Sequence, residues 1–271
     1  MLRIIADSTC DISKEDARKM GIQIVPISVR FGNEEFLDGV EITHEEFYTR
    51  LAECDELPKT SQPSPDTFMK VFNEAVAAGD DVLGIFISSD LSGTYQSACL
   101  AALDVEEETR KKLYMVDSRS ASIGTALLIR EAVKLRDAGV NVSDIAAACT
   151  EMSKYIKLTA VVGSLKYLKM GGRLSGAAAF AGTMLHITPV VSIEDGKVVV
   201  IGKTRGKKAA EKLMHDKLIK DGLSLTRDFM FGHINCSESL ETFINKSLTY
   251  ISDVNGNVGV SSIGCSVGTH V

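Results

Sequence analysis

Short apolar runs alternate with segments of helical periodicity through the first half of the chain. The runs show little polar alternation, which is typical of strands covered on both faces. They span residues 2–7, 22–30, 82–87 and 113–116. Helical segments with capping residues lie between them, such as residues 13–20, which begin at a serine and end at Gly21. Repeated strand–helix units of this length predict a parallel sheet with helices on both sides.

The second half has a different pattern. Residues 189–194 and 197–203 are strand-like and are joined by Asp195-Gly196, which predicts a β-hairpin. Further strands and helices alternate around this hairpin without a regular unit. We therefore predict an α/β protein of two domains, with a parallel-sheet α/β/α domain over residues 1–157 and a mixed α+β domain over residues 158–271.

Composition places the chain among globular proteins and excludes several classes of partner. Hydrophobic residues make up 45% of the 271 positions and charged residues 24%, so no long disordered stretch is expected. A net charge of −6 offers no general attraction to nucleic acid. No apolar run approaches the roughly 18 residues needed to span a bilayer, and residues 1–7 lack the build of a signal peptide. We expect a cytoplasmic protein without an integral membrane segment, although transient membrane contact stays open.

Cysteine and histidine spacing argues against disulfides and metals. The six cysteines are widely separated and form no Cys-x-x-Cys pair, which indicates free thiols in a reducing compartment. The five histidines are isolated, and none stands at metal-ligand spacing from another histidine or a cysteine. We therefore expect no metal site.

Residues 88–97 form a hydroxyl-rich loop between a buried strand and a helix. Ligands of open α/β sheets bind at such strand ends, and free N–H groups at a helix start favour an anion. Ser92 and Thr94 add hydroxyls, and Gly93 lets the backbone come close. The loop has neither the Walker ending nor the dinucleotide fingerprint. It predicts an anion site of unspecified ligand, with a simple helix cap as the alternative.

Other segments extend this site. The loop of residues 59–64 carries Thr60 and Ser61 and also precedes a helix, so that the two loops together would form an anion cradle. Arg173 stands in a glycine-bracketed turn that suits phosphate or carboxylate, or is a surface charge after a helix. Arg205 lies in the one short basic cluster of the chain. This cluster either contacts a ligand or partner, or is simply the solvated face of a helix. His270 follows a strand and has the reach to join the rim.

Taken together, these segments resemble the DegV family, the bacterial fatty-acid-binding proteins that partner a fatty acid kinase. The matching pieces lie in family order along the whole chain. They are Ala6-Asp7-Ser8-Thr9-Cys10-Asp11, Thr60-Ser61-Gln62-Pro63-Ser64, Ser88-Ser89-x-Leu91-Ser92-Gly93-Thr94-Tyr95-Gln96, Val116-Asp117-Ser118, Gly172-Arg173-Leu174 and Gly268-Thr269-His270. The chain departs from the family in stopping one residue after the last motif, at Val271.

The resemblance implies a long apolar tunnel between the two domains and a role for each motif. The fatty acid carboxylate would be held by Thr60, Ser61 and Ser92, with Gly93 and Thr94 in the same loop and His270 near the head group. Arg173 and Arg205 would serve the kinase partner or the transferred phosphate.

The resemblance also implies different roles for the kinase and for this chain. The kinase would phosphorylate the bound acid to an acyl phosphate, and this chain would be a non-catalytic carrier with no cofactor beyond its lipid. Chain-length preference would depend on tunnel-lining residues in segments 177–185 and 187–193. The rival hypothesis is an enzyme or binding protein for a small phosphorylated metabolite, because the fold looks similar to part of the dihydroxyacetone kinase family. No covalent histidine anchor and no nucleotide–metal carboxylates for that chemistry are assignable in the sequence.

Overall fold

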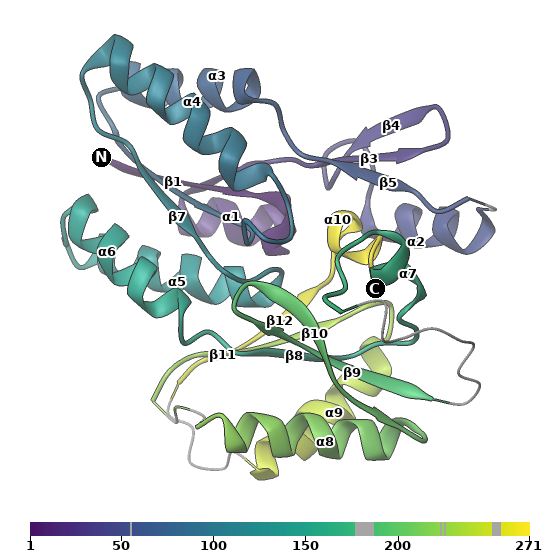
Figure 1. Ribbon diagram of the computed structural model, residues 1–271. Coiled ribbons are helices and arrows are strands. Elements are labelled where there is room, and N and C mark those ends of the chain that lie inside the picture. Colours follow the sequence, from purple (N-terminus) through teal and green to yellow (C-terminus); the bar gives the residue numbers. More distant parts are fainter. Residues whose placement is uncertain (55, 177–186, 223, 225, 251–255) are drawn as a thin grey trace.

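A four-stranded parallel sheet forms the centre of the first half of the molecule (Figure 1). The computed structural model describes residues 1–54, 56–176, 187–222, 224, 226–250 and 256–271. The sheet has the order β2-β1-β6-β7, and every neighbouring pair is parallel. Its strands are β1 (Leu2–Asp7), β2 (Ile22–Val25), β6 (Asp81–Phe86) and β7 (Tyr114–Asp117). The predicted parallel sheet is confirmed.

Helices cover both faces of this sheet, as the apolar runs predicted. Neighbouring side chains of a strand point to opposite faces, so the fully buried Ile4 and Ile5 enter two different cores. The helices of this half are α1 (Lys14–Met20), α3 (Pro65–Ala77), α4 (Thr94–Thr109), α5 (Ile123–Asp137) and α6 (Val142–Ser153), and the turn η1 (Ser8–Cys10) follows β1. Ile4 packs with apolar residues of α5 and α6, whereas Ile5 packs with those of α3 and α4.

The apolar run of residues 22–30, predicted as one strand, is divided between two sheets. Pro26 lies between β2 and β3 and has no N–H group to donate to a sheet. The next N–H group, that of Ile27, binds the Ser8 hydroxyl at 3.1 Å. The chain therefore leaves the parallel sheet at Pro26 and enters a small antiparallel one, of order β4-β3-β5.

This small sheet packs with two helices into a separate cluster. Its strands are β3 (Ser28–Phe31), β4 (Glu34–Leu37) and β5 (Lys59–Ser61), and its helices are α2 (His44–Glu53) and the short α10 (Cys265–Gly268). Val29, Phe47 and Cys265 are fully buried there. A segment close to residue 271 is therefore built into the core of residues 28–53.

The second half contains an antiparallel sheet and a two-stranded parallel one. The first has the order β10-β9-β8, and the predicted hairpin turn at Asp195-Gly196 is confirmed. These elements are β8 (Leu158–Val161), β9 (Thr188–Glu194), β10 (Lys197–Thr204), β11 (Phe229–His233) and β12 (Val258–Ser262), with helices α7 (Lys166–Met170), α8 (Lys207–Lys220) and α9 (Ser237–Tyr250). None of the helices in the described parts of the chain is long and apolar enough to cross a membrane. The division at residue 157 stays a prediction.

Candidate functional site

A pocket of about 1280 Å³ is lined by residues from both halves of the chain. Its walls come from α5, β8, β11, α8, α9 and the segment after α10. Most of the lining is apolar, and includes Leu127, Ile156, Val191, Met214, Phe231 and Phe243. The predicted lining segment 177–185 lies wholly outside the described residues, whereas Val191 and Ile193 of β9 line the pocket.

Predicted site residues from three distant segments meet at this pocket. Thr60 and Ser61 come from β5, Ser92 from the loop before α4, and His270 from the turn after α10; all four line the pocket. The Oγ1 atom of Thr60 lies 3.0 Å from Nε2 of His270, in hydrogen-bond contact across 210 positions of sequence. This end of the pocket, with Thr60, Ser92 and His270, is called the head end below.

The Ser92 loop is held in place by bonds within itself and by the neighbouring loop. The Oγ atoms of Ser92 and Thr94 are 2.8 Å apart, and Thr94 is fully buried. Gly93 starts α4 with an ordinary φ of −73°, so it is not needed for a left-handed turn. A Cβ atom there would lie 2.1 Å from Oε1 of Gln62, whose amide donates to Ser97 at 2.9 Å. The absence of a side chain at Gly93 therefore lets the two loops pack together.

The two predicted arginines take different places. Arg173 lines the pocket, where its Nε donates to the Leu91 carbonyl at 3.1 Å and its Nη1 to the Gly171 carbonyl at 2.5 Å. The guanidinium is thereby fixed beside the Ser92 loop. Arg205 is exposed in the turn between β10 and α8, outside the pocket lining.

His270 is a neutral side chain at neutral pH. Burial, together with the nearby charge of Arg173, lowers the pKa of His270 to about 4. Within the described part of the chain, its buried Nδ1 has no hydrogen-bond partner. A Cβ atom on Gly171 would lie 2.3 Å from that nitrogen, so Gly171 packs directly against the ring. The head end thus offers hydroxyls, a neutral imidazole and one guanidinium, which is a set suited to holding an anion.

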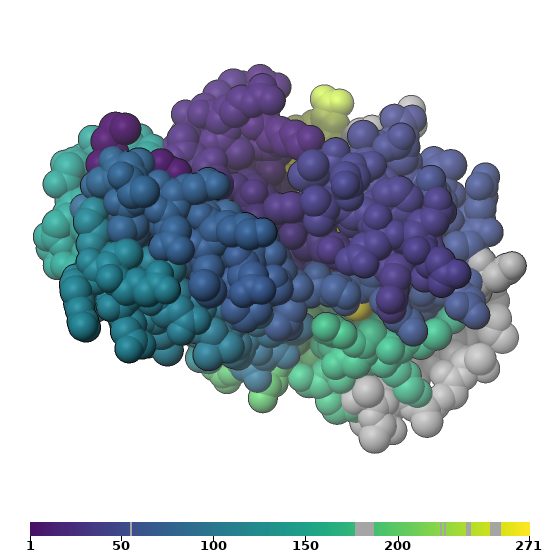
Figure 2. All heavy atoms as spheres, turned by 90° about the horizontal axis from the view of Figure 1, so that it is seen from above, coloured from purple at the N-terminus to yellow at the C-terminus, as the bar shows by residue number. Residues whose placement is uncertain are grey.

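Two buried aspartates hold the segment that carries His270. Asp38 accepts hydrogen bonds from the N–H groups of Cys265 and Ser266, at 3.2 and 3.1 Å, and from the Ser266 hydroxyl at 2.6 Å. Asp11 accepts from the Gly264 N–H at 2.8 Å and from the Ser122 hydroxyl at 2.5 Å. We call Asp11, Asp38 and residues 264–266 the C-terminal clasp. Figure 2 shows gold atoms from the end of the chain in the seam between blue and green residues.

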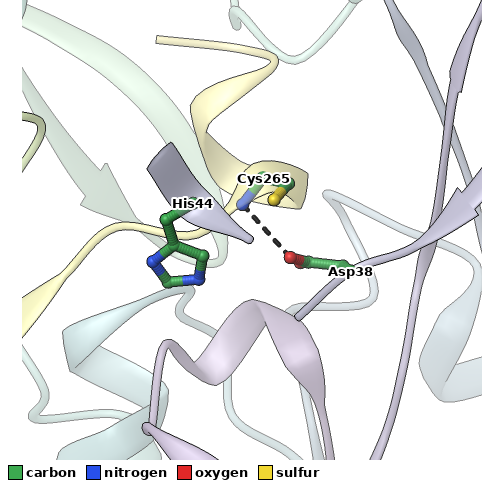
Figure 3. A group of neighbouring side chains, drawn as sticks. All are labelled: Asp38, His44 and Cys265. Atoms are coloured by element: carbon green, nitrogen blue, oxygen red, sulfur yellow. Dashed lines mark hydrogen bonds between the residues drawn. The ribbon is translucent and has the colours of Figure 1, made fainter. Parts of the chain in front are cut away.

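The clasp includes a group of side chains that resembles a metal site. Ligand atoms of Asp38, His44 and Cys265 lie within 4.8 Å of one another (Figure 3). Burial and the adjacent Asp38 carboxylate raise the pKa of the Cys265 thiol far above its ordinary value. The Asp38 oxygens already accept bonds from the start of α10. In this arrangement Asp38 acts as the hydrogen-bond acceptor for the start of α10 and is part of the clasp.

Sequence spacing did not identify either aspartate of the clasp. Asp38 bonds residues 227 and 228 positions away, and Asp11 bonds Gly264 across 253 positions. Burial raises the pKa of Asp11 to about 8, despite the two donors that favour its charged form. No local pattern in the sequence signals such partners. Asp11 stands in the motif Ala6-Asp7-Ser8-Thr9-Cys10-Asp11, but that motif does not indicate which segment Asp11 binds.

Comparison with known proteins finds one family along the whole chain. A family model described as "Uncharacterised protein, DegV family" matches residues 1–271. A DegV domain-containing protein of Caldanaerobacter subterraneus is 33% identical over 270 residues, which cover 99% of this chain and 94% of that protein. The fold is similar to a DegV family protein of Thermus thermophilus whose structure is described under "Fatty Acid Binding" (TM-score 0.86, 28% identity, 99% and 95% coverage). It is also similar to DegV of Bacillus subtilis, described as a fatty acid binding protein (TM-score 0.87, 27% identity, 99% and 94% coverage).

Proposed function

The chain belongs to the DegV family, and from this premise we propose that it binds a long-chain fatty acid and presents the carboxylate to a partner kinase. The tail would lie in the apolar pocket, and the carboxylate would lie at the head end. The observation that carries the proposal is the meeting of Thr60, Ser92 and His270 at one end of a pocket of about 1280 Å³. Two solved relatives, those of Thermus thermophilus and Bacillus subtilis, are described as fatty acid binding, which supports it.

Binding would rest on the tail, with the head end supplying orientation. Each methylene moved from water to an apolar wall contributes about 0.8 kcal/mol. In the tautomer with a proton on Nε2, His270 donates to Thr60, whose own hydroxyl hydrogen is then available to the carboxylate. Ser61 and Ser92 would add further hydroxyl donors, and Arg173 would balance the negative charge.

The same chemistry explains why we assign a carrier rather than a catalyst. Hydroxyls, a neutral imidazole and a fixed guanidinium recognise an anion, and the phosphoryl transfer would be supplied by the kinase. A small phosphorylated metabolite, the rival ligand, would satisfy Arg173 and the hydroxyls but would leave most of the large apolar pocket unfilled. A fatty acid would occupy both the apolar part of the pocket and the head end.

The protein purified from a bacterial host is expected to carry a fatty acid. The tail is removed from water in the pocket, so the complex should survive purification. Mass spectrometry of the denatured protein will detect the acid, and delipidated protein should take up added palmitate or oleate. Recovery of no lipid together with no uptake of either acid would exclude the carrier function.

The exposed Arg205 is expected to act on the kinase step and not on lipid binding. Because Arg205 lies outside the pocket lining, Arg205→Ala should leave fatty acid affinity unchanged. Loss of a charged contact at an interface should slow phosphorylation of the bound acid about tenfold. Arg18→Ala, which removes an exposed arginine of α1, is the matched control. Equal phosphorylation rates for Arg205→Ala and the wild type would remove this role.

A further inference from the structure

The pocket wall formed by α5 changes from apolar to charged along its length. Ile123, Leu127 and Glu131 line the pocket at intervals of four residues, which places them on one face of the helix. At 1.5 Å per residue, Glu131 lies about 12 Å along the axis from Ile123. The first two side chains suit an alkyl tail, and the third is a carboxylate.

The facing wall, β11, changes in the same direction. Near its end, Gly232 approaches Ile123: a Cβ atom there would lie 3.3 Å from Cγ2 of Ile123 and 2.8 Å from Cδ1 of Ile263, the residue that leads to α10. The part of the pocket next to Gly232 and Ile123 therefore adjoins the head end. At the opposite end of β11, Arg227 and Asp228 precede Phe229 and line the pocket. Five strand residues span about 17 Å, so Arg227 and Asp228 lie far from His270.

The charges of the two walls pair with each other. Arg227 Nη1 lies 3.0 Å from Glu131 Oε1, and Lys134 Nζ lies 2.6 Å from Asp228 Oδ2 and 3.7 Å from Glu131 Oε2. We call these four residues the distal ion-pair network. The two acids are the covered members, with side chains 20% and 15% exposed for Glu131 and Asp228. Asp228 also accepts from the Asn257 N–H at 3.0 Å, which fixes its carboxylate.

We propose that the distal ion-pair network closes the pocket at the end remote from Thr60 and His270 and sets the longest tail that binds well. This inference rests on the proposed function. A methylene placed among apolar side chains gains affinity about fourfold. A methylene pushed against Glu131 and Asp228 instead displaces water from charged groups and offers them no partner. Affinity should therefore rise with chain length up to the network and fall beyond it.

The test compares chain-length profiles of three proteins. Delipidated wild type, Glu131→Leu and Glu34→Leu are titrated with saturated acids from laurate to behenate, in steps of two methylenes. Glu34 is the matched control, because it pairs with Arg50 across two elements at 3.1 Å but lies outside the pocket lining. In Glu131→Leu the first acid beyond the wild-type limit should bind about sixteenfold more tightly than it binds to the wild type, since each of its two added methylenes contributes about fourfold. Shorter acids, and all acids in Glu34→Leu, should keep their wild-type affinities.

The outcomes distinguish a failure of the network's proposed role from a failure of the proposed fatty acid binding. A Glu131→Leu profile identical to that of the wild type overturns the network's role and leaves fatty acid binding in place. No binding of any acid by the wild type overturns both. If Glu131→Leu does not fold, Glu131→Gln provides the comparison, because it keeps the size of the side chain and removes the charge that opposes the tail. An unchanged profile in Glu131→Gln then overturns the proposal.

Discussion

Replacing Thr60 by valine is expected to weaken fatty acid binding about a hundredfold while the protein stays folded. Valine keeps the shape of the side chain and removes the one hydroxyl that meets both the proposed carboxylate and Nε2 of His270. The loss combines a hydrogen bond to a charged group with a buried imidazole nitrogen left unpaired, together about 3 kcal/mol. Isothermal titration of delipidated protein with palmitate or oleate measures the affinity.

The control for Thr60→Val is Thr150→Val. The Thr150 hydroxyl donates to the Ala146 carbonyl within α6, away from the pocket, so its removal should leave the affinity unchanged. Ser92→Ala should act in the same direction as Thr60→Val with a smaller effect, about tenfold, because His270 keeps its partner. Full affinity in both Thr60→Val and Ser92→Ala would mean that the carboxylate is held elsewhere.

Replacing Asp38 by alanine is expected to lower the free energy of unfolding by about 3 to 5 kcal/mol. The change leaves the Cys265 and Ser266 N–H groups at the start of α10 buried without their acceptor, together with the Ser266 and Ser8 hydroxyls. Urea unfolding measures the loss. Because residues 264–266 precede His270, fatty acid affinity should fall as well.

Asp104→Ala is the matched control for Asp38→Ala. Asp104 is exposed on α4, and substitutions at such positions usually change stability by less than about 0.5 kcal/mol. Asp38→Asn, which keeps one acceptor oxygen, should be intermediate between Asp38→Ala and the wild type. A stability of Asp38→Ala equal to that of Asp104→Ala would show that the clasp does not hold α10.

Much of the fold was predictable because its signals are local. An apolar run without alternation indicates a strand covered on both faces, and β1 and β6 are such strands, with Ile4 and Ile5 facing opposite cores. The hairpin at Asp195-Gly196 has an equally local turn signal. The run of residues 22–30 was predicted wrongly as one strand, because apolar character alone does not reveal that Pro26 interrupts the ladder.

The site was predictable only as separate pieces. Hydroxyl-rich loops before helices singled out Thr60 and Ser92, and the structure places both on one pocket with His270. The joining of those pieces depends on contacts between distant parts of the chain, such as Asp11 with Gly264, that no window of sequence contains. For the same reason, the pairing of Glu131 with Arg227 across the pocket had no signal in the sequence.

The C-terminal clasp also has a consequence for the order of events during synthesis. A chain leaving the ribosome has all four strands of the parallel sheet once Asp117 has emerged, long before Gly264 is made. The Asp38 carboxylate therefore lacks the Cys265 donor, 227 positions later, until that residue has been made. His270 can contact Thr60 only after that. A nascent chain would thus present an unclosed apolar pocket to chaperones and proteases, and lipid loading would be the last step of its maturation.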